Sequence, residues 1–438
     1  MKTVIMAGGK GTRISSVASD IPKPMIPIDG IPVLEREIQC LKNQGFDDLI
    51  ITVGHLGHII SEYFGNGEKN SPITGQPFGV HIEYYVENTP LGNAGALFRL
   101  KDKLTEKFLL LNADVVFDID FHRMVKYHED KGGLVTIFTH PNDHPYDSSL
   151  IVTDSDTKAV RHWIEKSEKR PEFYQNRVNA GIHVISPAIL DINVDSPQID
   201  LDKQLLKPLA GTGKMFAYDS PEYVKDMGTP DRYKAVCKDF QDGVIKAKNL
   251  KQKQKAIFLD RDGTINKYVG FLRKPDEFEL IEGTAQAIKK INNSEYLAIV
   301  ITNQPVIARG EVTWEELERI HQKMETLLGD EGAYLNGIYF CPHHPDKGYA
   351  GEVPELKVDC DCHKPKPGLL LKAAKDLHID LSQSWMIGDR ESDIKAGKAA
   401  GCKTALIGTQ KYDQDLTANS LQDAINKIYA MTGGNTYA

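Results

Sequence analysis

Short runs of consecutive apolar residues alternate along the chain with segments of helical periodicity. The runs are four to six residues long and rich in β-branched side chains, which is typical of strands buried on both faces of a sheet. Strands separated by helices predict an α/β fold with largely parallel sheets. The clearest runs are Thr3–Ala7, Leu49–Val53, Phe108–Leu111, Val135–Thr139, Ala256–Leu259, Leu297–Thr302 and Ser384–Ile387.

The pattern is interrupted near the middle of the chain. Pro230–Asp239 has the periodicity of a closing helix, and the residues after it are polar and rich in lysine, as solvated linkers are. A chain of 438 residues also exceeds what one hydrophobic core usually holds. We therefore predict one domain over residues 1–240, a linker over 241–255, a second domain over 256–410, and a tail over 411–438 that holds one amphipathic segment at Leu421–Tyr429.

Composition narrows the class of protein. Hydrophobic residues make up 41% of the chain and charged residues 26%, as in ordinary globular proteins. The net charge of -8 provides no basic surface for nucleic acid or an anionic membrane. No apolar run reaches the length of a membrane span, and Lys2–Ala7 is too short for a signal peptide. We expect a cytoplasmic protein that acts on small molecules.

A glycine-rich turn follows the first predicted strand. Gly8, Gly9 and Gly11 would let backbone N–H groups approach phosphate oxygens, and Arg13 and Lys23 would add the positive charge that a triphosphate needs. Tight turns also use glycine for packing alone, and the spacing is not that of a P-loop. The turn by itself therefore indicates a phosphate site only weakly.

The longer string Ala7–Arg13, followed by Pro22–Pro24, resembles the sugar-1-phosphate nucleotidyltransferases over about residues 1–235. The resemblance implies a Rossmann-like domain in which a sugar phosphate attacks the α-phosphorus of a nucleoside triphosphate and pyrophosphate leaves. Catalysis would rest on positioning and charge neutralisation by Mg²⁺. By this resemblance the nucleotide contacts are Gly8, Gly9, Gly11, Thr12 and Gly92, the sugar contacts are Glu165, Lys166, Asn179 and Gly181, the Mg²⁺ ligands are Asp114 and Asp226, and the catalytic charges are Arg13 and Lys23.

Two positions depart from that family's pattern. Asn93 stands where a small residue or Thr is frequent, and Asn112 stands where Gly or Asn-Gly is usual. Either change could alter the choice of base or sugar, and neither removes a catalytic charge. Taken singly, Asp114 could instead cap a strand end and Asp226 could cap a helix.

The second half opens with two carboxylates, Asp260 and Asp262, directly after a buried strand. Carboxylates two residues apart also occur in calcium loops, but the buried run before them does not suit an EF-hand. The string Asp260–Thr264, with Ile301–Gln304, His363–Gly368 and Gly388–Asp393, resembles the haloacid dehalogenase-like phosphatases over about residues 255–410. That resemblance implies a second Rossmann-like domain with Mg²⁺.

Each motif residue has an implied role in that family. Asp260 is the implied nucleophile, which forms an aspartyl phosphate, and Asp262 is the implied general acid and base. An acid role requires the surroundings to raise the pKa of Asp262. The other implied roles are phosphoryl binding by Thr302 and Asn303, charge neutralisation by Lys364, Mg²⁺ binding by Asp260, Asp389 and the Asp262 backbone, and support by Asp393 and Arg309.

Three of the six cysteines lie close together in the second half. Cys341, Cys360 and Cys362 with His343 could form a closed tetrahedral zinc site of structural type. The alternative of clustered core cysteines is disfavoured because the surrounding residues are polar. His344 adjoins the group but is the weaker candidate ligand.

This zinc loop resembles a narrower branch, the D-glycero-D-manno-heptose 1,7-bisphosphate phosphatases and their histidinol-phosphate relatives. Pro305-Val306 replaces the usual Ser-Gly, and proline removes a backbone N–H that would be available to contact phosphate. The N-terminal half is most similar to guanylyltransferases acting on heptose or mannose 1-phosphate. We expect a bifunctional enzyme that makes GDP-heptose. The alternatives are a mannose-1-phosphate guanylyltransferase or another sugar nucleotidyltransferase fused to a histidinol-phosphate-type phosphatase, and an N-terminal half that senses a nucleotide sugar without turnover.

Overall fold

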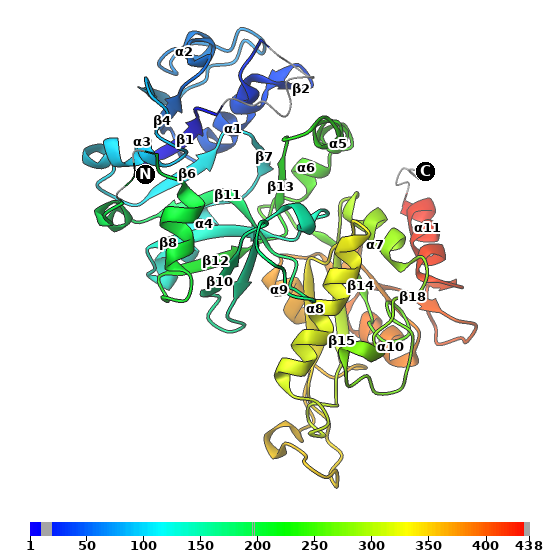
Figure 1. Ribbon diagram of the computed structural model, residues 1–438. Helices are drawn as coiled ribbons and strands as arrows, with labels where there is room; N and C mark the ends of the chain where they lie inside the picture. Colours follow the sequence, from blue (N-terminus) through cyan, green and yellow to red (C-terminus); the bar gives the residue numbers. More distant parts are fainter. Residues whose placement is uncertain (10–19, 195, 197, 433–438) are drawn as a thin grey trace. The chain divides into compact units, whose positions relative to one another are not determined.

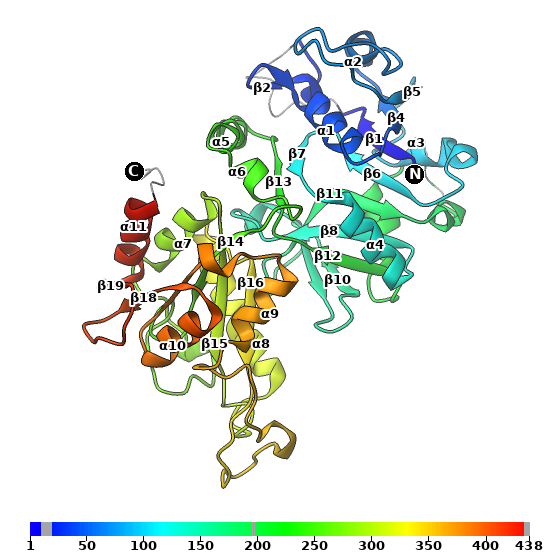
Figure 2. The same ribbon diagram turned by 180° about the vertical axis from the view of Figure 1, so that it is seen from behind.

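The computed structural model describes residues 1–9, 20–194, 196 and 198–432. Gly11, Thr12 and Arg13 therefore lie outside the described residues. The chain divides into two compact units, whose elements are labelled in Figures 1 and 2. Unit 1 comprises Met1–His140, Ser149–Glu165 and Val178–Asn249, and unit 2 comprises Pro141–Ser148, Lys166–Arg177 and Leu250–Ala438.

A nine-stranded sheet forms the centre of unit 1. Strands β6, β1, β4 and β5 pair in parallel, whereas β11 is antiparallel to β6, β8 and β9. The sheet is therefore mixed rather than largely parallel. Its path is β10-β9-β11-β6-β1-β4-β5; off this path, β8 pairs with β11 and β12 pairs with β8. The strands are β1 (Thr3–Ala7), β4 (Asp48–Val53), β5 (His81–Val86), β6 (Phe108–Asn112), β8 (Val135–His140), β9 (Leu150–Thr153), β10 (Val160–Ile164), β11 (Val178–Ile185) and β12 (Met215–Asp219).

Helices cover both faces of this sheet because successive residues of each strand point to opposite sides. Ile5 and Ala7 of β1 pack with α1, α2 and α4, while Val4 packs on the other face with α3 and the π-helix η6. The helices are α1 (Val33–Lys42), α2 (Gly57–Phe64), α3 (Gly95–Arg99), α4 (Phe121–Lys131) and η6 (Leu201–Leu206).

A two-stranded antiparallel sheet and two helices complete unit 1. Strand β13 (Tyr223–Asp226) pairs with β7 (Val115–Asp118), and α5 (Pro230–Gln241) and α6 (Val244–Ala247) follow β13. Lys248, expected in a solvated linker, is instead buried, and burial lowers its pKa to about 8. A short hairpin of β2 (Pro27–Ile28) and β3 (Ile31–Pro32) also lies in this unit.

Unit 2 is built on a six-stranded sheet whose pairings are all parallel. The order is β16-β15-β14-β17-β18-β19, so the chain moves from β14 to one side and later returns to the other. Such a reversal is the place where open α/β sheets bind ligands, at the carboxyl ends of the strands. The strands are β14 (Lys255–Leu259), β15 (Tyr296–Asn303), β16 (Gly337–Cys341), β17 (Trp385–Gly388), β18 (Lys403–Ile407) and β19 (Leu416–Ala418).

Helices again lie on both faces of the sheet. Ile257 and Leu259 of β14 pack with α7, α8 and α11, and Ala256 and Phe258 pack with α9 and α10. The segment expected as a tail thus supplies an edge strand and a core helix, up to Thr432. The helices are α7 (Thr284–Asn292), α8 (Trp314–Asp330), α9 (Gly368–Asp376), α10 (Glu391–Ala400) and α11 (Leu421–Thr432).

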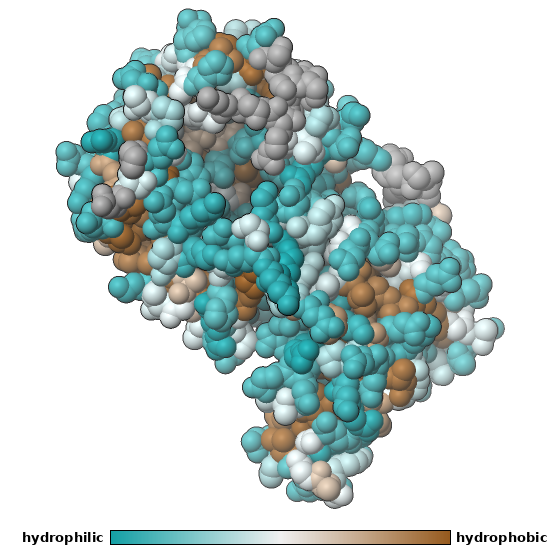
Figure 3. Space-filling model, viewed as in Figure 1, coloured by the Kyte–Doolittle hydropathy of each residue, from teal (hydrophilic) through white to brown (hydrophobic). Residues whose placement is uncertain are grey.

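The observed architecture confirms the expected α/β class, and each of the seven expected strands is present within one residue at either end. In the part of the chain that the structure describes, no helix combines the length and the apolar character needed to cross a membrane. On the face drawn in Figure 3, hydrophilic residues dominate and hydrophobic ones form separate patches.

Candidate active sites

Three neighbouring strands of unit 2 end at the same edge of the sheet. Asp260 follows β14, Thr302 and Asn303 close β15, and Asp389 follows β17. Because β15, β14 and β17 are adjacent and parallel, their carboxyl ends meet there. The fold therefore brings together the residues that the four sequence motifs of this half predicted.

Lys364 joins two of the carboxylates at this edge. Its Nζ lies 2.7 Å from Asp260 Oδ1 and 2.6 Å from Asp393 Oδ1, and it donates to the Ile301 carbonyl at 2.9 Å. The Asn303 side chain fixes the backbone of Lys364, accepting from its N–H at 3.0 Å and donating to its carbonyl at 3.1 Å. Asn303 thus orients the lysine even before any phosphoryl group is present.

The electrostatics of this edge suit a divalent cation. Burial raises the pKa of Asp260, and burial together with the charge of Asp260 raises the pKa of Asp389 to about 6. Burial alone would lower the pKa of Lys364, but the two carboxylates outweigh it and hold the pKa above its ordinary value. Asp260, Asp389 and Asp393 can each offer an oxygen within 4.8 Å of the others. Asp389 Oδ1 is buried and, among the described residues, accepts no hydrogen bond, which fits a Mg²⁺ ligand.

Gly263 permits the close approach of Asp389. Its φ is +92°, and a Cβ at this position would lie 2.4 Å from Asp389 Oδ2. Both the backbone conformation and the space exclude a side chain. The glycine of the Asp260–Thr264 motif is therefore needed to bring the two ends of the site together.

The pKa of Asp262 differs from the sequence expectation. Burial would raise it, but the Arg261 guanidinium, with Asn266 and Gln304, outweighs burial and holds the pKa below its usual value. Arg261 Nη2 lies 2.9 Å from Asp262 Oδ2, and the Arg261 side chain is fully buried. Without substrate, Asp262 is thus held as a carboxylate, and the raised pKa that the acid role requires is not found in the unliganded protein.

Arg309 lies between two aromatic rings. Its guanidinium carbon is 4.1 Å from the Phe271 ring centroid and 4.7 Å from that of Tyr349. The unusual Pro305 begins the turn that leads to it, since the Pro305 carbonyl accepts from the Arg309 N–H at 3.1 Å. Val306 is buried in a small apolar cluster, so the Pro305-Val306 replacement is accommodated by packing.

Unit 1 contains a cavity of about 710 Å³ at the carboxyl ends of β1, β4 and β6. Its lining includes Gly8, Gly9, Lys23, Gly92 and Asp114, which the sequence predicted for a nucleotide site. Lys23 Nζ is 2.6 Å from Asp114 Oδ2, so a cation and a carboxylate meet at the cavity wall. A hollow of this size with convergent polar groups is typical of a small-molecule site.

Asp226 lies next to Asp114 through strand pairing. It is paired with Val115 across the β13–β7 ladder, and the Met227 N–H donates to the Asp114 carbonyl at 3.3 Å. Its carboxylate accepts from Arg232 Nη1 at 2.9 Å and from the Gly228 N–H at 2.6 Å. Asp114 lines the cavity, as does Gly228, whereas Asp226 is not among the lining residues and its carboxylate is held by Arg232. Carboxylate oxygens are the donors that Mg²⁺ prefers, so the role of this pair in metal binding stays a prediction.

The four predicted sugar contacts fall into different surroundings. Glu165 pairs with Lys207 at 2.9 Å, whereas Lys166 belongs to unit 2 and lies 3.6 Å from Asp147. Gly181 lies against Asn112, because a Cβ there would be 2.3 Å from Asn112 Nδ2, and Asn112 lines the cavity. Asn179 accepts from the Gly181 N–H at 3.2 Å. Their roles stay predictions.

Asn93, one of the two departures from the nucleotidyltransferase pattern, holds a neighbouring segment through a hydrogen bond. Asn93 Oδ1 accepts from the Leu201 N–H at 2.7 Å and so holds the start of η6 against the cavity wall. Gly92 has φ +77°, and a Cβ there would be 2.3 Å from the Ile199 carbonyl oxygen. The segment after Pro90 is thus fixed by the chain around Ile199.

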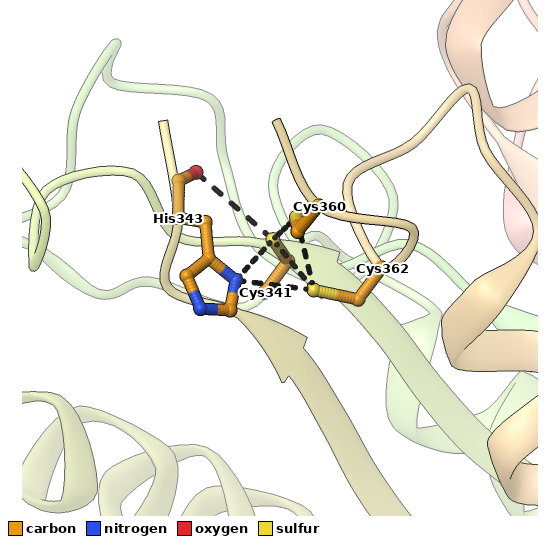
Figure 4. A group of neighbouring side chains, drawn as sticks. All are labelled: Cys341, His343, Cys360 and Cys362. Carbon is orange, nitrogen blue, oxygen red and sulfur yellow. Dashed lines mark hydrogen bonds between the residues drawn. The ribbon is translucent and has the colours of Figure 1, made fainter. Parts of the chain in front are cut away.

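The cysteine cluster of unit 2 lies at the end of β16 (Figure 4). The Sγ atoms of Cys341, Cys360 and Cys362 are 3.2–3.5 Å apart, and His343 Nδ1 is 3.2 Å from Cys362 Sγ. A disulfide needs about 2.0 Å, whereas sulfurs on one tetrahedral zinc ion stand about 3.8 Å apart. No two of the six cysteines, all of which belong to the described residues, are joined by a disulfide. The arrangement therefore fits a zinc ion better than a disulfide.

Sequence reasoning missed several site residues. Glu87 lines the cavity of unit 1 with its Oε1 near Gly8, and Gln304 and His321 hydrogen-bond Arg261 in unit 2. A lone Glu after a strand has no distinctive spacing. Arg261 could have been singled out, since it stands between two motif carboxylates.

Family models match both halves of the chain. The model described as nucleotidyl transferase matches residues 2–243, and one described as HAD-hydrolase-like matches residues 361–428. A D-glycero-beta-D-manno-heptose-1,7-bisphosphate 7-phosphatase of Pasteurella multocida is 44% identical over 160 residues, which is 36% of this chain and 84% of that protein. The chain therefore belongs to the nucleotidyl transferase family through its N-terminal half and to the family of these phosphatases through its C-terminal half. It is an enzyme with both classes of domain.

Two solved structures are also similar. HddC from Yersinia pseudotuberculosis is 26% identical with a TM-score of 0.45, covering 55% of this chain and 99% of that one. The D,D-heptose 1.7-bisphosphate phosphatase from B. bronchiseptica, complexed with magnesium and phosphate, is 29% identical with a TM-score of 0.36, covering 41% of this chain and 99% of that one.

Proposed function

We propose that the two halves carry out successive steps on one sugar. The C-terminal half removes the 7-phosphate of D-glycero-D-manno-heptose 1,7-bisphosphate, and the N-terminal half joins the resulting heptose 1-phosphate to GMP from GTP, giving GDP-heptose and pyrophosphate. The observation that carries this is the family membership of the two halves of one chain. A 7-phosphatase leaves a sugar 1-phosphate, which is the kind of substrate that sugar nucleotidyltransferases use.

The phosphatase step begins with attack by an Asp260 oxygen on the 7-phosphorus. The phosphorus–oxygen ester bond breaks, and Asp262, after taking up a proton, gives it to the leaving C7 oxygen. Water then attacks the aspartyl phosphate and loses a proton to Asp262, and inorganic phosphate leaves. Lys364, Thr302 and Asn303 hold the phosphoryl oxygens throughout. Bound Mg²⁺, held by Asp260 and Asp389, would supply positive charge for the phosphoryl group.

A bound substrate phosphate would allow Asp262 to take up the proton that its acid role requires. Arg261 holds the carboxylate ionised in the absence of substrate. A bound phosphate adds negative charge nearby, which favours the protonated form of Asp262. The same Arg261 then favours return to the carboxylate, the form that serves as base in the second step.

The transferase step needs no covalent intermediate. The 1-phosphate oxygen attacks the α-phosphorus of GTP, and the bond to the β-phosphate oxygen breaks. Lys23 lies at the cavity wall where it can neutralise phosphate charge, and Asp114 and Asp226 would hold Mg²⁺, which supplies further positive charge. Gly8 and Gly9 let the backbone approach the bound nucleotide.

Glu87 supports guanine as the base. It lines the cavity, and its Oε1 lies 3.3 Å from where a Cβ of Gly8 would stand. The pairing edge of guanine presents two neighbouring N–H donors, and one carboxylate can accept both. Uracil and thymine present one such donor between two acceptors. A carboxylate at this wall therefore favours guanine.

The Glu87→Gln variant is expected to use GTP about 10- to 100-fold less efficiently, because an amide offers one acceptor and one donor in place of two acceptors. The measurement is kcat/KM from pyrophosphate release with GTP and with UTP. The loss should be specific to GTP. Glu83→Gln on strand β5 is the matched control, since Glu83 pairs with Lys103 instead. An equal loss with both nucleotides, or none, would refute this role.

Zinc is proposed as a structural ion of the phosphatase half. Cys341, His343, Cys360 and Cys362 supply a full tetrahedral donor set, and Lys364 follows Cys362 by two residues. Elemental analysis should find about one zinc per chain. Cys360→Ser is expected to lower the unfolding temperature of unit 2 and to reduce phosphate release, while Cys237→Ser in unit 1 should do neither. A zinc-free wild type with full phosphatase activity would contradict the proposal.

The test of the whole proposal is a single-tube assay with the full chain and Mg²⁺. Phosphate release from heptose 1,7-bisphosphate, followed by pyrophosphate release on addition of GTP alone, is the expected result. Release of phosphate from histidinol phosphate, or pyrophosphate with mannose 1-phosphate only, would point to the alternative substrates. If no sugar 1-phosphate supports pyrophosphate release, the N-terminal half would instead be a nucleotide-sugar sensor without turnover.

We propose that the reaction takes place in the cytoplasm, where GTP is available. The heptose of the product is then incorporated into a surface polysaccharide. The cell that makes this chain is expected to lose heptose from that polysaccharide when the gene is deleted. Sugar analysis of the purified polysaccharide checks this, and an unchanged heptose content would contradict it.

A further inference from the structure

Two segments that interrupt the strands of unit 1 belong to unit 2. The first excursion, residues 141–148, lies between β8 and β9, and the second, residues 166–177, lies between β10 and β11. The chain therefore passes between the units five times, after residues 140, 148, 165, 177 and 249. In unit 2 both excursions contact α8.

Two faces of helix α8 make contacts: one packs into the core of unit 2 and the other contacts the excursions. Ile320, Met324 and Leu328 recur at spacings of four and pack into the core of unit 2. Another stripe, which includes Lys323 and Thr326, faces the second excursion: Lys323 Nζ lies 5.6 Å from the Phe173 ring centroid. We call this stripe the outer face of α8, made of Arg319, Lys323, Glu325, Thr326 and Gly329.

The second excursion is hydrogen-bonded to the outer face. The Tyr174 N–H donates to Thr326 Oγ1 at 2.9 Å, and the Thr326 hydroxyl lies 3.3 Å from the Tyr174 carbonyl. The first excursion approaches at Gly329, where a Cβ would stand 2.8 Å from Pro145 Cγ. Glycine at this point of the helix thus leaves the space that Pro145 needs.

The excursions also bind each other. The Asn142 N–H donates to Asn176 Oδ1 at 3.1 Å, and Asn176 Nδ2 donates to the Asn142 carbonyl at 2.7 Å. Asn142 and Asn176 are 6% and 1% exposed. The Asn176 side-chain amide thus makes two hydrogen bonds to the Asn142 backbone, and these fix one relative position, because buried polar groups are costly to leave unpaired.

A buried ion pair also joins the second excursion to α8. Arg177 Nη1 lies 3.1 Å from Glu325 Oε1, and the two side chains are 7% and 4% exposed. By contrast, Arg319 and Glu172 on the same face are 4.0 Å apart and 60% and 74% exposed. Breaking a buried pair leaves an uncompensated charge, whereas an exposed pair contributes little.

We propose that the outer face of α8 is a docking surface built for the two excursions, and that this surface keeps the N-terminal half bound to the phosphatase half independently of the linker. The partner that this surface fits is a pair of segments of this same chain: the second excursion binds through the Arg177 charge and the Tyr174 backbone, and the first packs Pro145 against Gly329. The proposal does not depend on the substrate of either half.

The test cuts the linker in the folded full-length protein. Residues 251–253 are exposed, so a protease recognition sequence inserted after Gln252 would be accessible. After cleavage the two fragments are expected to co-elute in size-exclusion chromatography at micromolar concentration, with phosphate release unchanged. Separation of the wild-type fragments under these conditions would overturn the proposal.

A charge variant tests the surface itself. Arg177→Glu places two carboxylates together in a buried position, and the cleaved variant is expected to dissociate with a dissociation constant at least tenfold higher than wild type. Arg319→Glu, on the same face but exposed, should behave as wild type. Co-elution of cleaved Arg177→Glu at wild-type strength would overturn the proposal. If the uncut variant has lost its wild-type circular dichroism, Gly329→Val, which collides with Pro145, takes its place with the same expected result.

Discussion

The Asp260→Asn variant is expected to lose phosphate release from heptose 1,7-bisphosphate by about 10⁴-fold or more, because the amide cannot form the phosphoryl intermediate. The substitution keeps the shape of the side chain. Lys364 keeps its partner Asp393 at 2.6 Å, so the fold of unit 2 should survive. The measurement is the single-turnover rate of phosphate release with saturating Mg²⁺.

The same variant provides its own internal control. When heptose 1-phosphate is supplied directly, pyrophosphate release with GTP should remain within about twofold of wild type, since Asp260 lies in unit 2 and the nucleotide cavity is in unit 1. Asp359→Asn, at an exposed carboxylate paired with Lys366, should leave phosphate release intact. Asp260→Asn with more than about a hundredth of wild-type turnover would rule out a covalent role.

The Asp114→Asn variant is expected to show the opposite loss. Pyrophosphate release should fall by about 10³-fold, because the variant removes a carboxylate proposed to bind Mg²⁺ beside the phosphates. Its partner Lys23, 2.6 Å away, would also lose the ion pair that places it at the cavity wall. Initial rates of pyrophosphate release with GTP and heptose 1-phosphate measure the effect.

Phosphate release should be unchanged in Asp114→Asn, so that the two variants together separate the two activities. Asp130→Asn is the matched control, since Asp130 forms an exposed helical pair with Lys126 and lies outside the cavity lining. Activity of Asp114→Asn equal to that control would refute the proposed role of Asp114 in binding the catalytic Mg²⁺.

Strands were the part of the fold that local pattern could predict. Runs such as Ala256–Leu259 are apolar at every position because helices cover both faces of the sheet, and such runs need no knowledge of the rest of the chain. The mixed character of the unit 1 sheet could not be predicted in this way. Whether β11 runs parallel or antiparallel to β6 depends on how the chain returns, not on the residues of the strand.

The site was predictable where residues cluster in sequence and not where they meet only in space. The Asp260–Thr264 motif, Lys364 and the cysteine cluster have recognisable spacing, and the structure brings them together. The lowered pKa of Asp262 depends on Arg261, whose neighbours Gln304 and His321 come from distant segments. The excursions escaped prediction for the same reason, since their partner α8 lies far along the chain.

The order of synthesis gives the excursions a particular folding history. Domains generally fold in the order in which they leave the ribosome, and both excursions emerge well before α8, which begins at Trp314. The sheet of unit 1 can therefore form while Tyr174, Asn176 and Arg177 still have no helix to cover them. A nascent chain paused before α8 should be open to protease at residues 166–177, and that sensitivity should disappear once the phosphatase half is complete.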